Sequence, residues 1–254
     1  MRKLLLLFII TVTFLMSLPD LNAQTVRYTY PRPRWVVGIG PVWNLATNDA
    51  YGRANYESQD QILKDNYGMR WGWGGYIYGK YSPGKTRVDR IFLGFDYKGM
   101  TNADFSDENK TSYDITTIDA GYEYLFYGTY GFRSYYGGGL TLNFISGEYT
   151  PKTETATNFS KSFESSLRVG LEIKAGLEFV LKNKHRNLGI NFGGRYNLMN
   201  LFNDDNSVNT TGSKTDLSLN DGNDTGGPGF KRYIGMFSID VGLNIYPDVK
   251  RIRR

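Results

Sequence analysis

The side chains that most often perform chemistry in enzymes are scarce in this sequence. Its 254 residues contain no cysteine and one histidine, His185, which lies among cations in the segment KNKHRN. The lack of cysteine excludes a thiol nucleophile, a thiolate zinc site, a disulfide framework and a lipid-anchoring cysteine. Enzymes built on membrane barrels commonly use a histidine beside Ser or Asp. We interpret His185 as a solvated turn residue and predict no catalytic residue and no cofactor, with a lipid-modifying enzyme kept as an alternative.

Aspartates gather in one polar segment, residues 201–230. Clustered oxygen ligands can bind Ca²⁺, but the spacing of these side chains matches no calcium-binding loop. We therefore interpret the segment as a solvated loop and predict no metal site. The aspartates are Asp204, Asp205, Asp216, Asp221 and Asp224.

Most other charged residues alternate with apolar ones. In Leu167–Leu181, LRVGLEIKAGLEFVL, one set of alternate residues is apolar throughout, and the other is charged or glycine except for Val180. This alternation predicts a β-strand. The strand is longer than the five or six residues or so that are usual in soluble proteins. Its length suits a tilted strand that crosses a bilayer.

Seven further stretches show the same alternation, which gives eight strands. Long polar connections alternate with tight turns, the plan of a bacterial outer-membrane barrel. We predict an all-β fold, an eight-stranded antiparallel up-and-down transmembrane β-barrel with long extracellular loops, short periplasmic turns and both termini on the periplasmic side. The further strands are 35–45, 67–80, 88–99, 116–126, 132–145, 187–198 and 233–246; the long loops are 46–66, 100–115, 146–166 and 199–232, and the turns are 81–87, 127–131 and 182–186.

Composition agrees with this prediction and excludes other classes. The mean hydropathy of −0.43 excludes a bundle of transmembrane helices. Glycine (30) and tyrosine (20) are both abundant, as expected for a β-rich protein with aromatic residues at membrane interfaces. The net charge of +5 comes without a basic stripe interleaved with aromatics, so we predict no nucleic-acid partner.

Alternation alone does not say which face looks outward, because a soluble barrel would turn its apolar face inward around a ligand. Glycines on the polar face suit a narrow lumen, and aromatics near the ends of the apolar faces resemble two girdles at the membrane interfaces. We therefore predict a polar lumen and an apolar, lipid-facing exterior. The predicted girdle comprises Trp35, Trp43, Trp71, Tyr97, Tyr124, Tyr136, Tyr196 and Tyr233.

Charges of both signs on the polar face would then lie inside the barrel. Buried charges persist when they are paired and hydrogen-bonded, so we predict a structural network. A small gated ion path through Arg168, Glu172 and Glu123 is the alternative. The predicted network comprises Arg70, Arg90, Asp96, Lys98, Asp119, Glu123, Arg168, Glu172, Lys174, Glu178, Arg195 and Asp240.

The chain ends fit export to an outer membrane. Residues 1–23 have the basic start, apolar run and small-residue site of a signal peptide cleaved near Ala23. We predict a periplasmic lead-in at 24–34, the barrel at 35–246 and a basic periplasmic tail at 247–254. The cationic turns and tail would contact anionic lipid head groups or a periplasmic protein.

With this architecture the chain resembles the small outer-membrane barrels of Gram-negative bacteria, of the OmpA membrane-domain and OmpX type, or a PorT-like barrel. Such barrels often end on an aromatic residue, whereas here PDVKRIRR follows Tyr246. The resemblance implies a monomeric, non-enzymatic barrel in the outer membrane with an envelope-structural role or a protein or glycan partner at its loops. A PorT-like resemblance implies instead an accessory subunit of a secretion or assembly machine, and a narrow pore is a further alternative.

Overall fold

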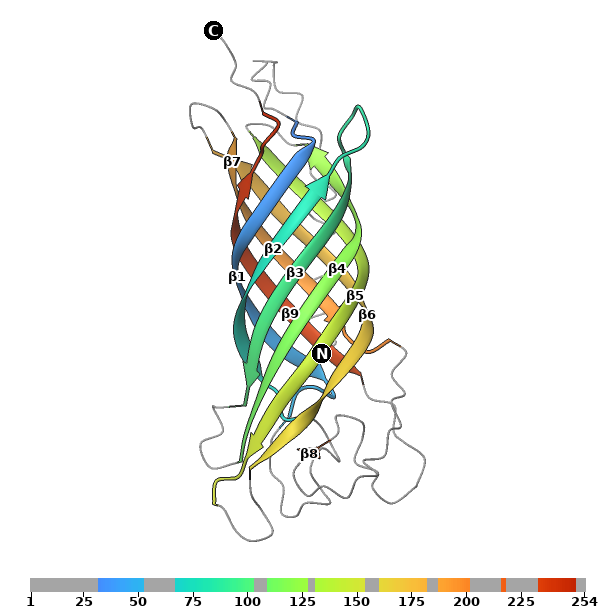
Figure 1. Cartoon of the computed structure of the whole chain (residues 1–254). Coiled ribbons are helices and arrows are strands. Elements are labelled where there is room, and N and C mark those ends of the chain that lie inside the picture. Colours follow the sequence, from blue (N-terminus) through green and yellow to red (C-terminus); the bar gives the residue numbers. More distant parts are fainter. Residues whose placement is uncertain are drawn as a thin grey trace, which may run out of the picture.

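The protein is a closed antiparallel β-barrel (Figure 1). The computed structural model describes residues 32–52, 67–102, 109–127, 131–153, 160–181, 187–201, 216–217 and 233–249. Eight long strands pair with their neighbours, and the ring closes through β1 with β9 and β5 with β6. The two-residue β8 adds to the outer end of β6 in parallel. The strands are β1 (Trp35–Asn48), β2 (Trp71–Tyr81), β3 (Asp89–Thr101), β4 (Lys110–Tyr127), β5 (Phe132–Thr150), β6 (Lys161–Val180), β7 (Leu188–Leu198), β8 (Asp216–Leu217) and β9 (Ile234–Ile245).

The predicted eight-stranded barrel is thus confirmed. Short connections lie at one end with both described ends of the chain, residues 32 and 249, and the longer connections lie at the other (Figure 1). In the part of the chain that the structure describes, no helix is long and apolar enough to cross a bilayer.

The outer surface of the barrel is apolar. Large side chains stand out from every long strand, with exposed fractions of 61% for Leu93, 60% for Leu167 and 63% for Ile173. Their neighbours in sequence point inward and are buried, as Lys98 and Arg90 are. A continuous belt of this kind would be unstable in water and matches the hydrocarbon layer of a bilayer. The soluble, apolar-inside alternative is therefore wrong.

Three neighbouring strands are longer than predicted at the long-loop end. β4 begins at Lys110, β5 ends at Thr150 and β6 begins at Lys161, where the prediction had loops at 100–115 and 146–166. In this part of β4 the apolar residues are on the inner face. Tyr113 and Ile115 are buried inside, and Asp114 is exposed outside. This change of face marks the edge of the belt, because beyond it the outer face meets water.

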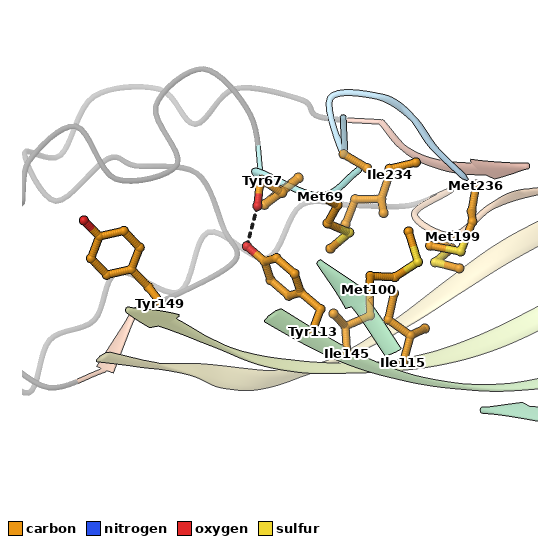
Figure 2. Close-up of a cluster of buried hydrophobic side chains, with 12 residues drawn as sticks. Tyr67, Met69, Met100, Tyr113, Ile115, Ile145, Tyr149, Met199, Ile234 and Met236 are labelled. Atoms are coloured by element: carbon orange, nitrogen blue, oxygen red, sulfur yellow. Dashed lines mark hydrogen bonds between the residues drawn. The ribbon is translucent and has the colours of Figure 1, made fainter. Parts of the chain in front are cut away.

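The inner face at the same end is filled by an apolar plug (Figure 2). Residues 49–52 and 67–69 fold back over the mouth, where Tyr67 and Met69 are fully buried and Tyr113 Oη donates a hydrogen bond of 2.6 Å to the Tyr67 carbonyl. The prediction had placed Tyr67 and Met69 on the outer face of a strand, and it was wrong because β2 begins only at Trp71. The plug comprises Ala46, Ala50, Tyr67, Met69, Met100, Tyr113, Ile115, Ile145, Tyr149, Met199, Ile234 and Met236.

The short-turn end is held by the residues that follow β9. Asp248 accepts backbone hydrogen bonds from Arg34 at 2.7 Å and from Trp35 at 3.2 Å, and it lies 3.8 Å from Arg87. The carboxylate thus ties the C-terminal segment to the start of β1. The predicted signal peptide, most of the lead-in and residues 250–254 lie outside the described residues.

Candidate functional site: the ion-pair network of the lumen

Charged side chains cross the lumen between the plug and the short-turn end. Each comes from an inward position of a strand, and its neighbours along the strand point outward. They form two clusters along the barrel axis, which we name the turn-end cluster and the mid-barrel cluster. The turn-end cluster comprises Lys80, Arg90, Glu123, Arg133 and Glu178, and the mid-barrel cluster comprises Asp96, Lys98, Asp119, Glu172, Lys174 and Arg195.

The turn-end cluster is built around Glu178 on β6. Arg90 donates to both of its oxygens, at 2.6 and 3.2 Å, and also to Glu123 at 3.1 Å. Lys80 lies 3.0 Å from Glu123 and 3.6 Å from Glu178, and Arg133 lies 3.7 Å from Glu178. All five side chains are at most 2% exposed. Because every charge has an opposite partner, the cluster can persist out of bulk water.

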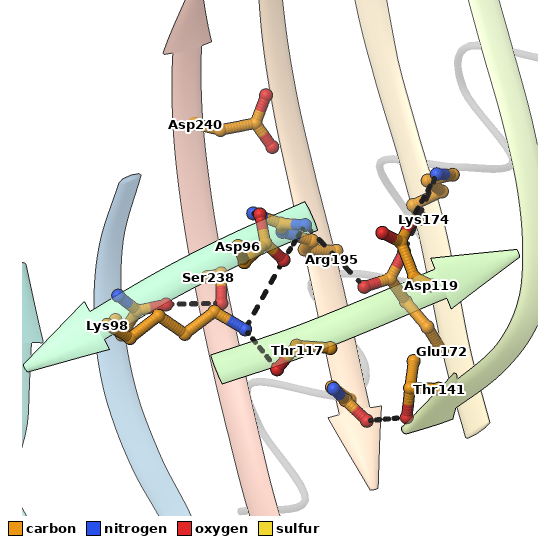
Figure 3. Close-up of polar contacts among 12 residues, drawn as sticks. Asp96, Lys98, Thr117, Asp119, Thr141, Glu172, Lys174, Arg195, Ser238 and Asp240 are labelled. Atoms are coloured by element: carbon orange, nitrogen blue, oxygen red, sulfur yellow. Dashed lines mark hydrogen bonds and ion pairs between the residues drawn. The ribbon is translucent and has the colours of Figure 1, made fainter. Parts of the chain in front are cut away.

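The mid-barrel cluster joins opposite walls of the barrel (Figure 3). Arg195 on β7 donates two hydrogen bonds to Asp96 on β3, at 2.6 and 2.8 Å. Lys174 bridges Asp119 and Glu172 at 3.6 and 3.5 Å. A planar guanidinium that forms two parallel hydrogen bonds fixes direction as well as distance, so this pair sets the spacing of the two walls.

Ten of the twelve residues predicted for the lumen network lie in these clusters or beside them. Asp240, the tenth, accepts a hydrogen bond of 2.8 Å from Asn191 and lines a cavity together with Asp119 and Arg195. Arg70 and Arg168 lie nearer the long-loop end. Arg168 donates through Nε to Ser166 Oγ at 2.8 Å, and Arg70 is half-buried just before β2.

Two cations of the turn-end cluster were missing from the predicted network. Lys80 shares one face of its strand with Tyr78 and Tyr76, and Arg133 shares one face with Tyr135. Both cations therefore occupy inward positions. The same alternation that placed the other charges was therefore sufficient to find them. Lys80 ends the predicted strand 67–80 and Arg133 lies near the start of the predicted strand 132–145, and the predicted network left both out.

The two clusters with Asp240 are balanced in formal charge. They contain six cations, Lys80, Arg90, Lys98, Arg133, Lys174 and Arg195, and six carboxylates, Asp96, Asp119, Glu123, Glu172, Glu178 and Asp240. A pathway selective for one sign of ion would need an excess of the other sign along its wall. The balance instead favours a structural filling that holds the walls together.

A small cavity lies within the mid-barrel cluster. Its volume of about 20 Å³ has room for roughly one water molecule. Asp119 lines the cavity, and its Oδ1 accepts no hydrogen bond from the described residues, whereas its Oδ2 pairs with Lys174 at 3.6 Å. Inward glycines make this space: a Cβ at Gly94 would overlap Asp119 Oδ1. The chemistry available here is hydration of ion pairs.

The predicted girdle residues all lie on the outer face. Trp35, Tyr97, Tyr136 and Tyr233 are about half exposed, and the other four are half-buried. Trp35 stacks at a tilt on Tyr81 at the short-turn end, with centroids 4.5 Å apart. At the other end Tyr196 Oη accepts a hydrogen bond of 2.8 Å from Asn48. Their role at the membrane interfaces stays a prediction. His185, Asp204, Asp205, Asp221 and Asp224 lie outside the described residues, and Asp216 is in β8.

Comparison with solved structures finds bacterial proteins that are similar to this chain at low sequence identity. Neisserial surface protein A is 14% identical, covers 84% of this chain and 96% of its own length, and has a TM-score of 0.49. OprG from Pseudomonas aeruginosa is 8% identical over 83% of this chain and 94% of its own (TM-score 0.48), and Ail of Yersinia pestis is 14% identical over 84% and 99% (0.41). No protein-family model and no curated protein sequence matches the chain.

Proposed function

We propose that this chain is a non-enzymatic barrel of the bacterial outer membrane that recognises a protein or glycan at the cell surface. The observation that carries the proposal is the sheet formed by the outer ends of β4, β5 and β6. Its strands remain paired as far as Lys110 with Thr150 and Tyr149 with Lys161. We name these paired ends, residues 110–115, 145–150 and 161–167, the projecting sheet.

The projecting sheet has the surface of a water-exposed element. Asp114 and Glu148 are exposed on its outer side, whereas deeper positions on the same strands carry exposed Ile118 and Leu142. The sheet therefore extends past the apolar belt. If the belt lies in the outer membrane with the termini in the periplasm, the projecting sheet faces the outside of the cell.

The projecting sheet also has an incompletely paired edge. β6 begins to pair with β7 only at Leu171, opposite Leu198. Nearer its start, the described residues pair β6 with β8 at Ser162 and Phe163, and the Leu201 N–H donates to the Val169 carbonyl at 2.8 Å. Sheet edges bind extended segments through backbone hydrogen bonds, and side chains on the two faces supply selectivity.

Site-specific photo-crosslinking on intact cells tests the proposal. A photoreactive residue is placed at Ser162 or at Glu148, both exposed on the projecting sheet, and at Lys85 on a short turn as the control. We expect adducts from the projecting sheet and none from Lys85. Folding of each variant is checked by the difference in gel mobility before and after boiling. A folded barrel that gives no adduct at Ser162 or Glu148 contradicts surface recognition.

A second candidate is an accessory subunit of an outer-membrane secretion or assembly machine. The observation that favours it is the basic short-turn end, where Arg32, Arg34 and Lys85 are exposed. Such a face suits an acidic periplasmic protein, although anionic lipid head groups would attract it equally. Adducts from Lys85 to one protein, with none from the projecting sheet, would favour this candidate.

A further inference from the structure

The methionines of this chain are gathered in one place. The sequence has six, of which two lie in residues 1–23. The other four are Met69, Met100, Met199 and Met236, and all belong to the apolar plug with exposed fractions of 0–1%. An apolar filling alone does not require methionine, because Ile115 and other isoleucines of the same plug already serve that purpose.

Four separate parts of the chain bring these side chains together. Met69 precedes β2, Met100 lies near the end of β3, Met199 follows β7 and Met236 lies near the start of β9. Met236 is paired with Asn197, and the Met199 N–H donates to the Ile234 carbonyl at 2.8 Å. Met199 and Met236 are therefore inward diagonal neighbours on adjacent strands, within reach of long side chains.

Small residues leave room for the thioethers to converge. Gly72 is paired with Met100, and a Cβ at Gly72 would overlap the Gly99 carbonyl oxygen and lie 2.7 Å from Met100 Sδ, so the sulfur packs closely against the glycine. Ala46 is paired with Met236 and likewise extends little into the lumen. Figure 2 shows the side chains of Met100, Met199 and Met236 gathered at one point of the plug.

We propose that Met100, Met199 and Met236 form a binding site for a soft monovalent cation, Cu⁺ or Ag⁺. Neutral thioether sulfur is a soft ligand that selects such ions, whereas Mg²⁺, Ca²⁺ and Mn²⁺ require oxygen ligands. Tyr67 and Tyr113 of the same plug add aromatic rings, which attract cations. The site would lie at the extracellular mouth of the barrel, above the ion-pair clusters.

Silver titration of the full chain, folded in detergent micelles, tests the site without a reductant. We expect one Ag⁺ per chain by calorimetry, with at least tenfold weaker binding after Met100→Leu, Met199→Leu or Met236→Leu and loss of binding in the triple variant. Leucine is nearly isosteric with methionine, so the plug is expected to remain packed. Ile145→Leu, in the same plug, is the matched control and should bind as the parent does.

Selenomethionine protein gives a direct second measurement. X-ray absorption at the selenium edge is expected to show silver in the first shell of at least two selenium atoms per chain. A triple variant that keeps its heat-modifiable mobility and binds Ag⁺ like the parent overturns the proposal. So does an absence of binding to the folded parent. Binding lost in His185→Ala but retained in the triple variant would assign the ion to the histidine and equally overturn it.

Discussion

Replacement of Glu178 with glutamine is expected to destabilise the barrel more than any exposed charge change. Glu178 is fully buried and holds Arg90, Lys80 and Arg133. The parent cluster has three cations and two carboxylates, and the variant would have three cations and one. Removing one partner from a buried ion pair costs about 3–5 kcal/mol, because the remaining charges stay buried without compensation.

Urea unfolding of the refolded barrel in micelles measures this cost. With a denaturant slope of about 2 kcal/mol/M, the midpoint should fall by roughly 1.5–2.5 M. The matched control is Glu148→Gln, an exposed carboxylate on the projecting sheet. Exposed substitutions of this kind are usually within about 0.5 kcal/mol of the parent.

A double variant separates the charge argument from a loss of packing. Glu178→Gln combined with Arg90→Met restores the parent excess of one cation, since the cluster would then hold Lys80, Arg133 and Glu123. We expect the double variant to be more stable than the sum of the single effects by about 1–3 kcal/mol. Additive costs, or a Glu178→Gln barrel within about 1 kcal/mol of the parent, would refute the view that the cluster is held by charge pairing.

Three further predictions use the same unfolding measurement. Gly94→Val should destabilise the barrel by about 1–3 kcal/mol, because the added Cβ would overlap Asp119. Gly79→Val is the control and should not destabilise it, because no atom lies within 4 Å of the added Cβ. Equal costs for the two variants would contradict the packing reason. Leu140→Arg, on the lipid face, should cost about 2–4 kcal/mol in phospholipid vesicles, and a neutral effect would place that residue outside the hydrocarbon. Asp248→Ala should cost about 1–2 kcal/mol and accelerate hydrogen exchange at the first amides of β1, and unchanged exchange would show that the carboxylate does not hold that end.

The strands and the direction of their side chains could be predicted from the sequence because a bilayer imposes one simple rule. Outward residues are apolar, and inward residues are charged, polar or glycine. Every residue between Leu167 and Leu181 obeys this rule, apart from Val180, which faces inward in a small apolar cluster at the short-turn end with Val36 and Tyr246. The same rule placed the inward charges on β3, β4, β6 and β7. Which carboxylate pairs with which cation could not be predicted, because pairing depends on shear and register around the closed ring.

The rule fails where the surroundings of the strand change. Around Tyr113 and Ile115 the inside is apolar and the outside is polar, so the segment looks like an irregular loop to a search for apolar-outside strands. The plug was missed for the same reason, and Tyr67 and Met69 were assigned to the lipid face. The longer strands and the plug would both have been found by a search for strands in which the apolar residues move from the outer face to the inner face.

The ion pairs of the lumen join residues that are far apart in the sequence, and this separation affects how the barrel forms. Arg195 and Asp96 are 99 residues apart, and Arg90 and Glu178 are 88 residues apart. A partial sheet that ends at β5 thus lacks the partners that Asp96 meets on β7. Contacts this distant in sequence form late, since the entropy of a large loop must be overcome first. We therefore expect an unfinished sheet to carry unpaired lumen charges, and to remain unsuited to lipid, until its last strands are in place.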